Sequence, residues 1–126
     1  MTIKEVSEKY DLTPDTLRYY EKVGLLNNVP RNASGIRDYD NKTLKKIEFI
    51  KCMRSSGVEI EVLLKYMNLM SKGKSTSLER KKLLEDQRVK LLDKKKNIED
   101  TLERLNYKIE VYQEILDGKR KDFTEE

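Results

Sequence analysis

Residues 77–117 contain neither glycine nor proline, and their apolar side chains recur at alternating steps of four and three. Eight of the ten positions reached by these steps between Leu84 and Leu116 are apolar; the exceptions are Arg88 and Lys95. So regular a stripe on a charged helix cannot be buried within so small a chain. We therefore predict a helix of roughly 40 residues, about 60 Å long, that packs on a partner helix. The predicted interface residues are Leu84, Leu91, Ile98, Leu102, Leu105, Ile109, Tyr112 and Leu116.

The first residues of the chain carry signals for two short helices separated by a tight turn. Thr2 and Glu5 have the spacing of a capping box at the start of the first helix. Thr13 followed by Pro14 is typical of a second helix start, and Gly24 provides its left-handed exit. We predict that this second helix runs over residues 14–23 and that the pair forms a helix-turn-helix.

The second helix has two distinct faces. Leu17 and Tyr20 lie three residues apart and are expected to pack inward, whereas Arg18, Tyr19 and Lys22 point outward. A short helix that presents guanidinium, phenol and ammonium groups to solvent suits DNA.

A short hairpin, or wing, is predicted for residues 31–39. Ser34-Gly35 is a turn signal between two short segments. Strand alternation would place Arg37 and Tyr39 on one face, where both could reach phosphate oxygens. The residues alone leave open an ordinary polar hairpin without a ligand.

Two motifs, RYYEKVGLL at residues 18–26 and SGIRDYD at residues 34–40, give the chain a resemblance to the MerR family of bacterial transcription regulators. The resemblance covers nearly the whole chain. It implies a mainly α-helical homodimer whose winged helix-turn-helix precedes an antiparallel coiled coil, with the recognition helix in the major groove and the wing on the flanking backbone. The alternative for this surface is a solvated face without a ligand. The residues expected to contact DNA are Thr13, Thr16, Arg18, Tyr19, Lys22, Arg37 and Tyr39.

The distribution of charge agrees with a polyanionic partner. Residues 1–74 contain 14 basic and 10 acidic side chains, whereas residues 75–126 contain 13 of each. The chain has no histidine, one cysteine and no glycine-rich phosphate loop. We therefore expect no metal site, no cofactor and no enzymatic activity.

The remaining sequence suggests how the chain is divided. Asp40 is a helix cap for residues 41–56, and a further helix is predicted for residues 59–72, with Met67 and Met70 as core filler. A linker follows at 72–77, in which Thr76 and Glu79 have capping-box spacing. We predict a DNA-binding domain at 1–74, a dimerisation helix at 75–117 and a disordered tail at 118–126.

Cys52 has two interpretations. A lone cysteine near a packed helix face is often a small buried hydrophobic residue. Lys51 and Arg54 are close in sequence, however, and positive charge favours the reactive thiolate. Residues 35–57 also resemble the branch of the family that senses aldehydes and other thiol-reactive electrophiles, which implies that Cys52 is the sensor.

The resemblance implies a regulator that binds a palindromic operator within an over-long promoter spacer and distorts the double-stranded DNA so that RNA polymerase can align with both promoter elements. One rival is a repressor or architectural DNA-binding protein without a sensor. A second is a coiled-coil adaptor that binds only protein. With no signal peptide and no long apolar run, a cytoplasmic bacterial protein without membrane contact is expected.

Overall fold

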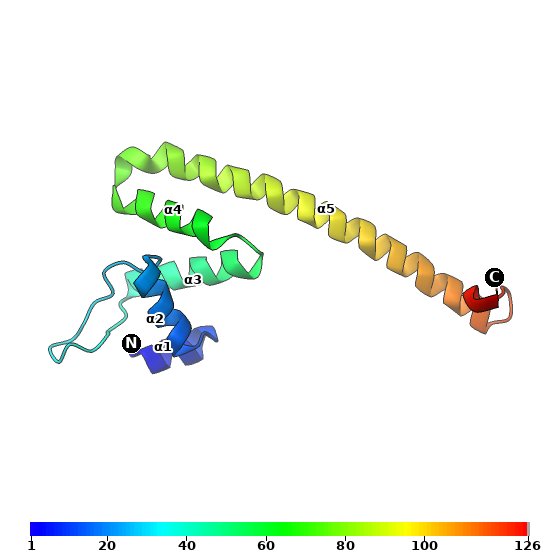
Figure 1. Ribbon diagram of the computed structural model, residues 1–126, viewed down its shortest axis with the longest axis horizontal. Coiled ribbons are helices and arrows are strands. Elements are labelled where there is room, and N and C mark those ends of the chain that lie inside the picture. Colours follow the sequence, from blue (N-terminus) through cyan, green and yellow to red (C-terminus); the bar gives the residue numbers. More distant parts are fainter. Residues whose placement is uncertain (126) are drawn as a thin grey trace. The chain divides into compact units, whose positions relative to one another are not determined.

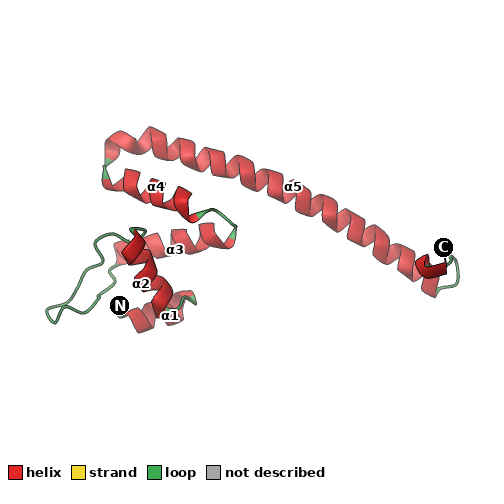
Figure 2. Ribbon diagram, in the orientation of Figure 1, coloured by secondary structure: helices red, strands yellow, loops and turns green. Residues whose placement is uncertain are grey.

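The computed structural model describes residues 1–125, all of whose regular elements are helical. Figure 1 follows the helices along the chain, and Figure 2 separates them from the loops. Two compact units are formed, residues 1–85 and the part that begins at Asp86. The expected domain boundary at residue 74 remains a prediction. The elements are α1 (Ile3–Tyr10), α2 (Pro14–Val23), α3 (Asn41–Ser55), α4 (Ile60–Ser71), the 3₁₀ helix η1 (Lys74–Thr76), α5 (Ser77–Leu116) and the 3₁₀ helix η2 (Phe123–Glu125).

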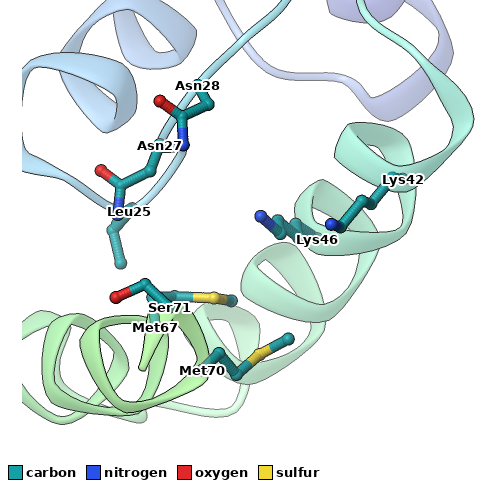
Figure 3. Close-up of a pocket in the computed structure, with 8 residues that line it drawn as sticks. All are labelled: Leu25, Asn27, Asn28, Lys42, Lys46, Met67, Met70 and Ser71. Atoms are coloured by element: carbon teal, nitrogen blue, oxygen red, sulfur yellow. The ribbon is translucent and has the colours of Figure 1, made fainter. Parts of the chain in front are cut away.

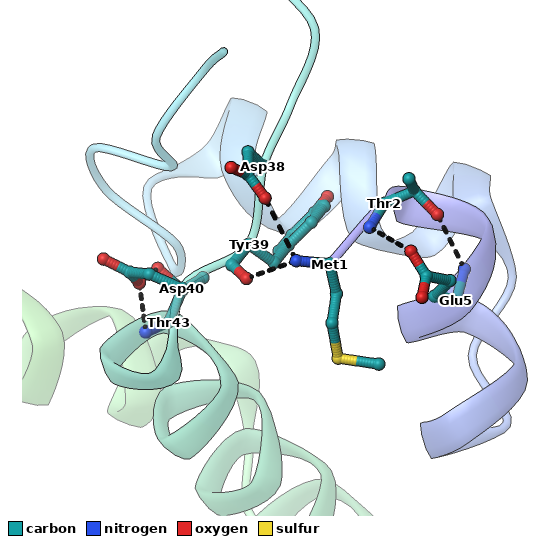
Figure 4. A network of polar contacts seen from close by, with 7 residues as sticks. All are labelled: Met1, Thr2, Glu5, Asp38, Tyr39, Asp40 and Thr43. Atoms are coloured by element: carbon teal, nitrogen blue, oxygen red, sulfur yellow. Dashed lines mark hydrogen bonds and ion pairs between the residues drawn. The ribbon is translucent and has the colours of Figure 1, made fainter.

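The helix-turn-helix is formed by α1 and α2, with the predicted caps in place. The Thr2 Oγ1 atom accepts a hydrogen bond from the Glu5 amide at 3.2 Å, and the Thr2 amide donates to Glu5 Oε1 at 3.0 Å (Figure 4). At the start of α2, Thr13 Oγ1 accepts from the Thr16 amide at 3.1 Å. Gly24 ends α2 with φ of +94°, a conformation that other residues rarely adopt. These local contacts confirm the predicted limits of α2.

One hydrophobic core holds the first unit together. Leu17, Tyr20 and Leu25 are buried as predicted, and they pack with residues of α1, α3 and α4. Burial of this apolar surface is what stabilises so small a unit. The fully buried side chains with the largest volumes are Tyr39, Leu17, Leu25, Leu26, Ile47, Ile50 and Val6.

The α3 and α4 helices begin and end close to the predicted residues. Asp40 caps α3 by accepting from the Thr43 amide at 2.9 Å and from its hydroxyl at 2.6 Å (Figure 4). In α4, Met67 is buried and Met70 half-buried against the core, which confirms both as packing residues.

The predicted capping box between Thr76 and Glu79 is wrong. Thr76 is buried in η1, and its hydroxyl lies 2.7 Å from the Leu69 carbonyl oxygen and 2.8 Å from that of Gly73. The Thr76 oxygen also accepts from Arg80 Nε at 3.0 Å. Thr76 therefore links the end of α4 to the linker. A buried hydroxyl that lacked an acceptor would cost more free energy than an uncapped helix end that water can solvate.

The predicted long helix is present as α5, which has 40 residues. Of its eight predicted interface residues, Leu91 is half-buried and the others are exposed on the single chain: Leu84, Ile98, Leu102, Leu105, Ile109, Tyr112 and Leu116. Among residues 1–125, not one helix combines the length and apolar character that crossing a membrane would require.

The disorder predicted for residues 118–126 remains a prediction, and the described part of this segment contains the 3₁₀ helix η2. The chain turns back after α5, and the Phe123 ring meets the Tyr112 ring edge-on at a centroid distance of 5.4 Å. The Lys108 ammonium lies 3.6 Å from the centre of the Phe123 ring. Val111 is only 2% exposed. The Phe123 ring thus packs against the last turns of α5 through an aromatic and a cation–π contact. Residue 126 lies outside the described residues.

Candidate nucleic-acid interface

The outward face of α2 carries the predicted cationic and aromatic side chains. Arg18, Tyr19 and Lys22 are exposed, with Tyr19 at 47%. The Arg18 guanidinium is paired with the Asp15 carboxylate at 3.0 Å, and both groups are solvated. An exposed pair of this kind contributes little to stability, so Arg18 can exchange Asp15 for a phosphate or a base at small cost.

The two threonines at the start of α2 form a local hydrogen-bonding unit. Thr13 is exposed and Thr16 half-buried, and their hydroxyl oxygens are 2.8 Å apart. The Thr13 oxygen is also the cap of α2. Both predicted contacts therefore lie at a helix N-terminus, where free amide groups favour an anionic ligand.

The wing is a tight turn in which the Asn32 side chain accepts two backbone hydrogen bonds. Asn32 Oδ1 accepts from the Ser34 amide at 2.9 Å and from the Ile36 amide at 3.1 Å. The two arms pair as an antiparallel bridge between Arg31 and Arg37. Ile36, beside this turn, is 59% exposed. The turn signal at Ser34-Gly35 therefore identified the wing correctly.

Glu21 joins the wing to α2. Its carboxylate accepts from Arg37 Nε at 3.3 Å and from the Arg37 terminal nitrogen at 3.2 Å. Arg31 adds a bond at 3.4 Å from the outer side. Arg37 is 25% exposed and is engaged by Glu21, and its contact with phosphate remains a prediction. Arg31, at 46% exposure, is the more accessible of the two cations. Neither Glu21 nor Arg31 was among the predicted site residues, because the signal for both is a contact between distant residues.

The predicted DNA contact through Tyr39 is wrong. Its side chain is 1% exposed and lies in the core, and its buried hydroxyl has no partner among the described residues. Burial raises the pKa of Tyr39, against a smaller lowering by Arg37. Alternation failed here because the hairpin arms pair only as far as Asp38, whose amide donates to the Pro30 carbonyl at 2.7 Å, and Tyr39 pairs instead with the first residue of the chain. The Tyr39 amide donates to the Met1 carbonyl at 2.8 Å, and the Met1 amine donates to the Tyr39 carbonyl at 2.9 Å (Figure 4).

Cys52 is a free thiol on the exposed surface of α3. This exposed position excludes the interpretation of Cys52 as a buried core residue. It also leaves the sulfur accessible to a reagent. The neighbouring cations are held elsewhere. Lys51 donates to the Tyr10 carbonyl, and Arg54 donates to the Val58 carbonyl at 2.9 Å. Although Lys51 and Arg54 are close to Cys52 in sequence, their side chains bond to these carbonyls and not to the Cys52 sulfur, as far as residues 1–125 are described.

A helix that follows a tight turn, presents Arg18, Tyr19 and Lys22 to solvent and has a wing held beside it defines a winged helix-turn-helix DNA-binding protein. Residues 1–70 match the model of the MerR HTH family of regulatory proteins, and the chain belongs to this family. It is a DNA-binding transcription regulator of the MerR type.

Known relatives agree in sequence and in structure. The HTH-type transcriptional regulator AdhR of Bacillus subtilis (strain 168) is 50% identical over 93 residues, which are 74% of this chain and 66% of AdhR, slightly less than two thirds of its length. A putative MerR family regulator from Listeria monocytogenes superposes with a TM-score of 0.88 at 38% identity, over 94% of this chain and 89% of that one. HiNmlR, described as a MerR family regulator lacking the sensor domain and bound to promoter DNA, superposes with a TM-score of 0.84 at 28% identity, over 92% of both chains. These relatives are named as regulators and not as enzymes.

Proposed function

We propose that the protein acts as a homodimer joined through α5. The support is the stripe from Leu84 to Leu116, which is apolar, regularly spaced and largely exposed on one chain. Such a stripe in water favours a second copy of the same helix. An antiparallel pair of α5 helices would place one winged helix-turn-helix at each end and so match a palindromic operator.

The DNA-reading surface of each copy is α2 with its wing. Arg18, Tyr19 and Lys22 would enter the major groove, with Thr13 and Thr16 beside the backbone. Arg31 and Arg37 would meet the flanking phosphates. The exposure of the first three side chains, together with the Glu21 contact that holds the wing beside α2, is the observation that carries this proposal.

Binding at both half-sites would bend or untwist the DNA between them. Such deformation has an energy that depends on sequence, and it can shorten the effective spacing of two promoter elements. The regulator would then activate transcription at a promoter with an over-long spacer by letting RNA polymerase contact both elements. The complex of HiNmlR with promoter DNA supports a promoter as the target.

Cys52 would supply the signal. Its thiolate sulfur adds to the carbonyl carbon of an aldehyde, and the carbonyl oxygen takes a proton to give a hemithioacetal. Accessibility supports this step, since Cys52 is exposed. Because α3 lies between the wing and α4 in the chain, added bulk on α3 would bias how the dimer distorts its operator.

A promoter footprint with and without aldehyde, carried out in the presence of RNA polymerase, tests the proposal. We expect the same protected palindrome in both cases, with hypersensitive sites at its centre and an open promoter only after aldehyde exposure. A footprint and a transcript level that ignore aldehyde would support a repressor or an architectural protein without a sensor. If the protein protected no sequence at any promoter, the remaining interpretation would be a coiled-coil adaptor that binds only protein.

A further inference from the structure

A cavity of about 290 Å³ opens between the loop that follows α2, the first turns of α3 and the end of α4 (Figure 3). Its residues belong to the first compact unit and include none of the predicted DNA contacts. A volume of this size approaches the lower limit of small-molecule sites in proteins.

The inner wall of the cavity is apolar and adaptable. Leu25 from the loop and Met67 from α4 belong to the core, and Met70 packs against it. Methionine side chains are unbranched and polarisable, so they adjust to apolar ligands of differing shape. This wall favours a hydrocarbon body over a purely ionic ligand.

The outer wall carries two cations. Lys42 and Lys46 lie one turn apart on α3, and Figure 3 shows the Lys46 side chain extending toward the loop that contains Asn27 and Asn28. Within residues 1–125 neither ammonium group forms a hydrogen bond or an ion pair. Hydrogen bonds from the Thr43 hydroxyl and amide lower the pKa of Asp40, and the charge of Lys42 makes a smaller contribution in the same direction.

We propose that this cavity binds a small organic carboxylate with a short apolar body. The carboxylate would lie between Lys42 and Lys46, where a charge-assisted hydrogen bond is stronger than a neutral one. The Asn27 and Asn28 carboxamides supply further N–H donors, whereas the Ser71 hydroxyl already donates to the Asn68 carbonyl at 2.6 Å. The hydrocarbon part would cover Leu25, Met67 and Met70. Two positive charges that form no ion pair within residues 1–125, beside an apolar wall, select this chemistry over a neutral or cationic ligand.

The cavity is placed to influence DNA binding, and this consequence rests on the proposed function. The loop at residues 25–28 is the connection from the recognition helix α2 toward the wing. A ligand that joins this loop to α3 and α4 would restrict how α2 and the wing adjust to a deformed operator. It can do so only to the extent that it prefers one of these arrangements.

Nuclear magnetic resonance titration of the full chain with hexanoate tests the site without DNA. Hexanol and hexylammonium serve as probes of the same length without the negative charge. We expect hexanoate to shift the amide signals of residues 25–28 and 70–71, with a weaker effect of hexanol and none of hexylammonium. The double variant Lys42→Gln, Lys46→Gln should bind hexanoate at least about tenfold less tightly, as expected for lost hydrogen bonds to a charged group. The variant Lys45→Gln, on the same helix but outside the cavity, should bind as the unchanged protein does.

Two results would overturn the site. One is hexanoate binding that the double variant and Lys45→Gln affect equally. The other is no binding of hexanoate, combined with a reduced salt dependence of operator binding in the double variant, which would make the lysines phosphate contacts. Because hexanoate binding is measured on the free protein, its loss is distinguishable from a failure to bind operator.

Discussion

The Glu21 carboxylate on α2 accepts hydrogen bonds from the Arg37 guanidinium on the wing, at 3.2–3.3 Å across 16 residues of sequence. Both groups are largely removed from solvent, at 20% and 25% exposure. The contact holds the wing beside α2, the helix that we propose reads DNA. An acidic residue in a DNA-binding surface thus has a role that its charge alone would not indicate.

Replacing Glu21 with glutamine should lower the preference for operator over random duplex. The carboxamide keeps one acceptor but loses the charge, so the wing becomes less constrained while its two arginines become freer to bind any phosphate. We expect operator binding to weaken by about 1 kcal/mol and non-specific binding to hold or rise. Titrations of both duplexes measure the ratio. Glu8→Gln, an exposed change on α1, is the control, and an unchanged ratio in Glu21→Gln would contradict the positioning role.

Truncating Arg18 to alanine should weaken operator binding by about 1–3 kcal/mol if its guanidinium contacts a base. Loss of base contact reduces affinity for operator but not for random DNA, whereas loss of a phosphate contact reduces both and lowers the salt slope by about 1. Binding measured over a range of salt concentrations distinguishes the two. Lys65→Ala on α4 serves as a control for lost positive charge. Equal affinity for operator and random duplex in the unchanged protein at every salt concentration would refute specific recognition.

Changing Leu105 and Ile109 to lysine should produce a monomer that is unfolded or binds DNA weakly. Both side chains are exposed on the single chain, and two charges would prevent their burial against a partner helix. Analytical ultracentrifugation at micromolar concentration should show the unchanged protein as a dimer. Asn106→Lys adds charge next to the stripe and should remain dimeric. A monomeric unchanged protein would refute the coiled coil.

Replacing Cys52 with serine should leave the fold and operator binding intact and abolish the response to aldehyde. The exposed position means that the hydroxyl is solvated, so the substitution should cost well under about 1 kcal/mol in folding. Mass spectrometry should detect an electrophile adduct on Cys52, and a promoter assay should show an uninducible serine variant. Moving the thiol one turn along α3, with Ser55→Cys added to Cys52→Ser, tests whether position matters. An unmodified Cys52 together with an inducible serine variant would exclude it as the sensor.

Removing the ring of Phe123 should loosen the last turns of α5. The ring lies against Tyr112 and Lys108, so Phe123→Ala should cost about 1–2 kcal/mol locally through lost apolar burial and cation–π attraction. Hydrogen exchange of residues 108–116 should become faster while that of α1–α4 is unchanged. Lys121→Ala in the same tail is the control. Unaltered exchange in Phe123→Ala would mean that the tail does not stabilise the helix.

The ends of α2 and the spacing of the α5 stripe could be predicted because each depends on residues close together in the chain. Thr13 caps an amide three residues away, and Gly24 adopts its left-handed conformation locally. Leu102, Leu105 and Ile109 share a face through helical geometry alone. The outward positions of Arg18, Tyr19 and Lys22 follow from the same geometry once Leu17 and Tyr20 are inward.

Tertiary structure decided the features that join distant residues. Tyr39 is buried because its ring enters a core built from four helices, and the Met1 backbone pairs with it across 38 residues. Glu21 meets Arg37 only after the wing folds beside α2. Cys52 is exposed because of how α3 packs, which apolar spacing near a helix end does not determine. Spacing in the sequence determines on which side of a helix a residue lies. Which neighbouring element covers that side depends on how the whole fold buries its apolar surface.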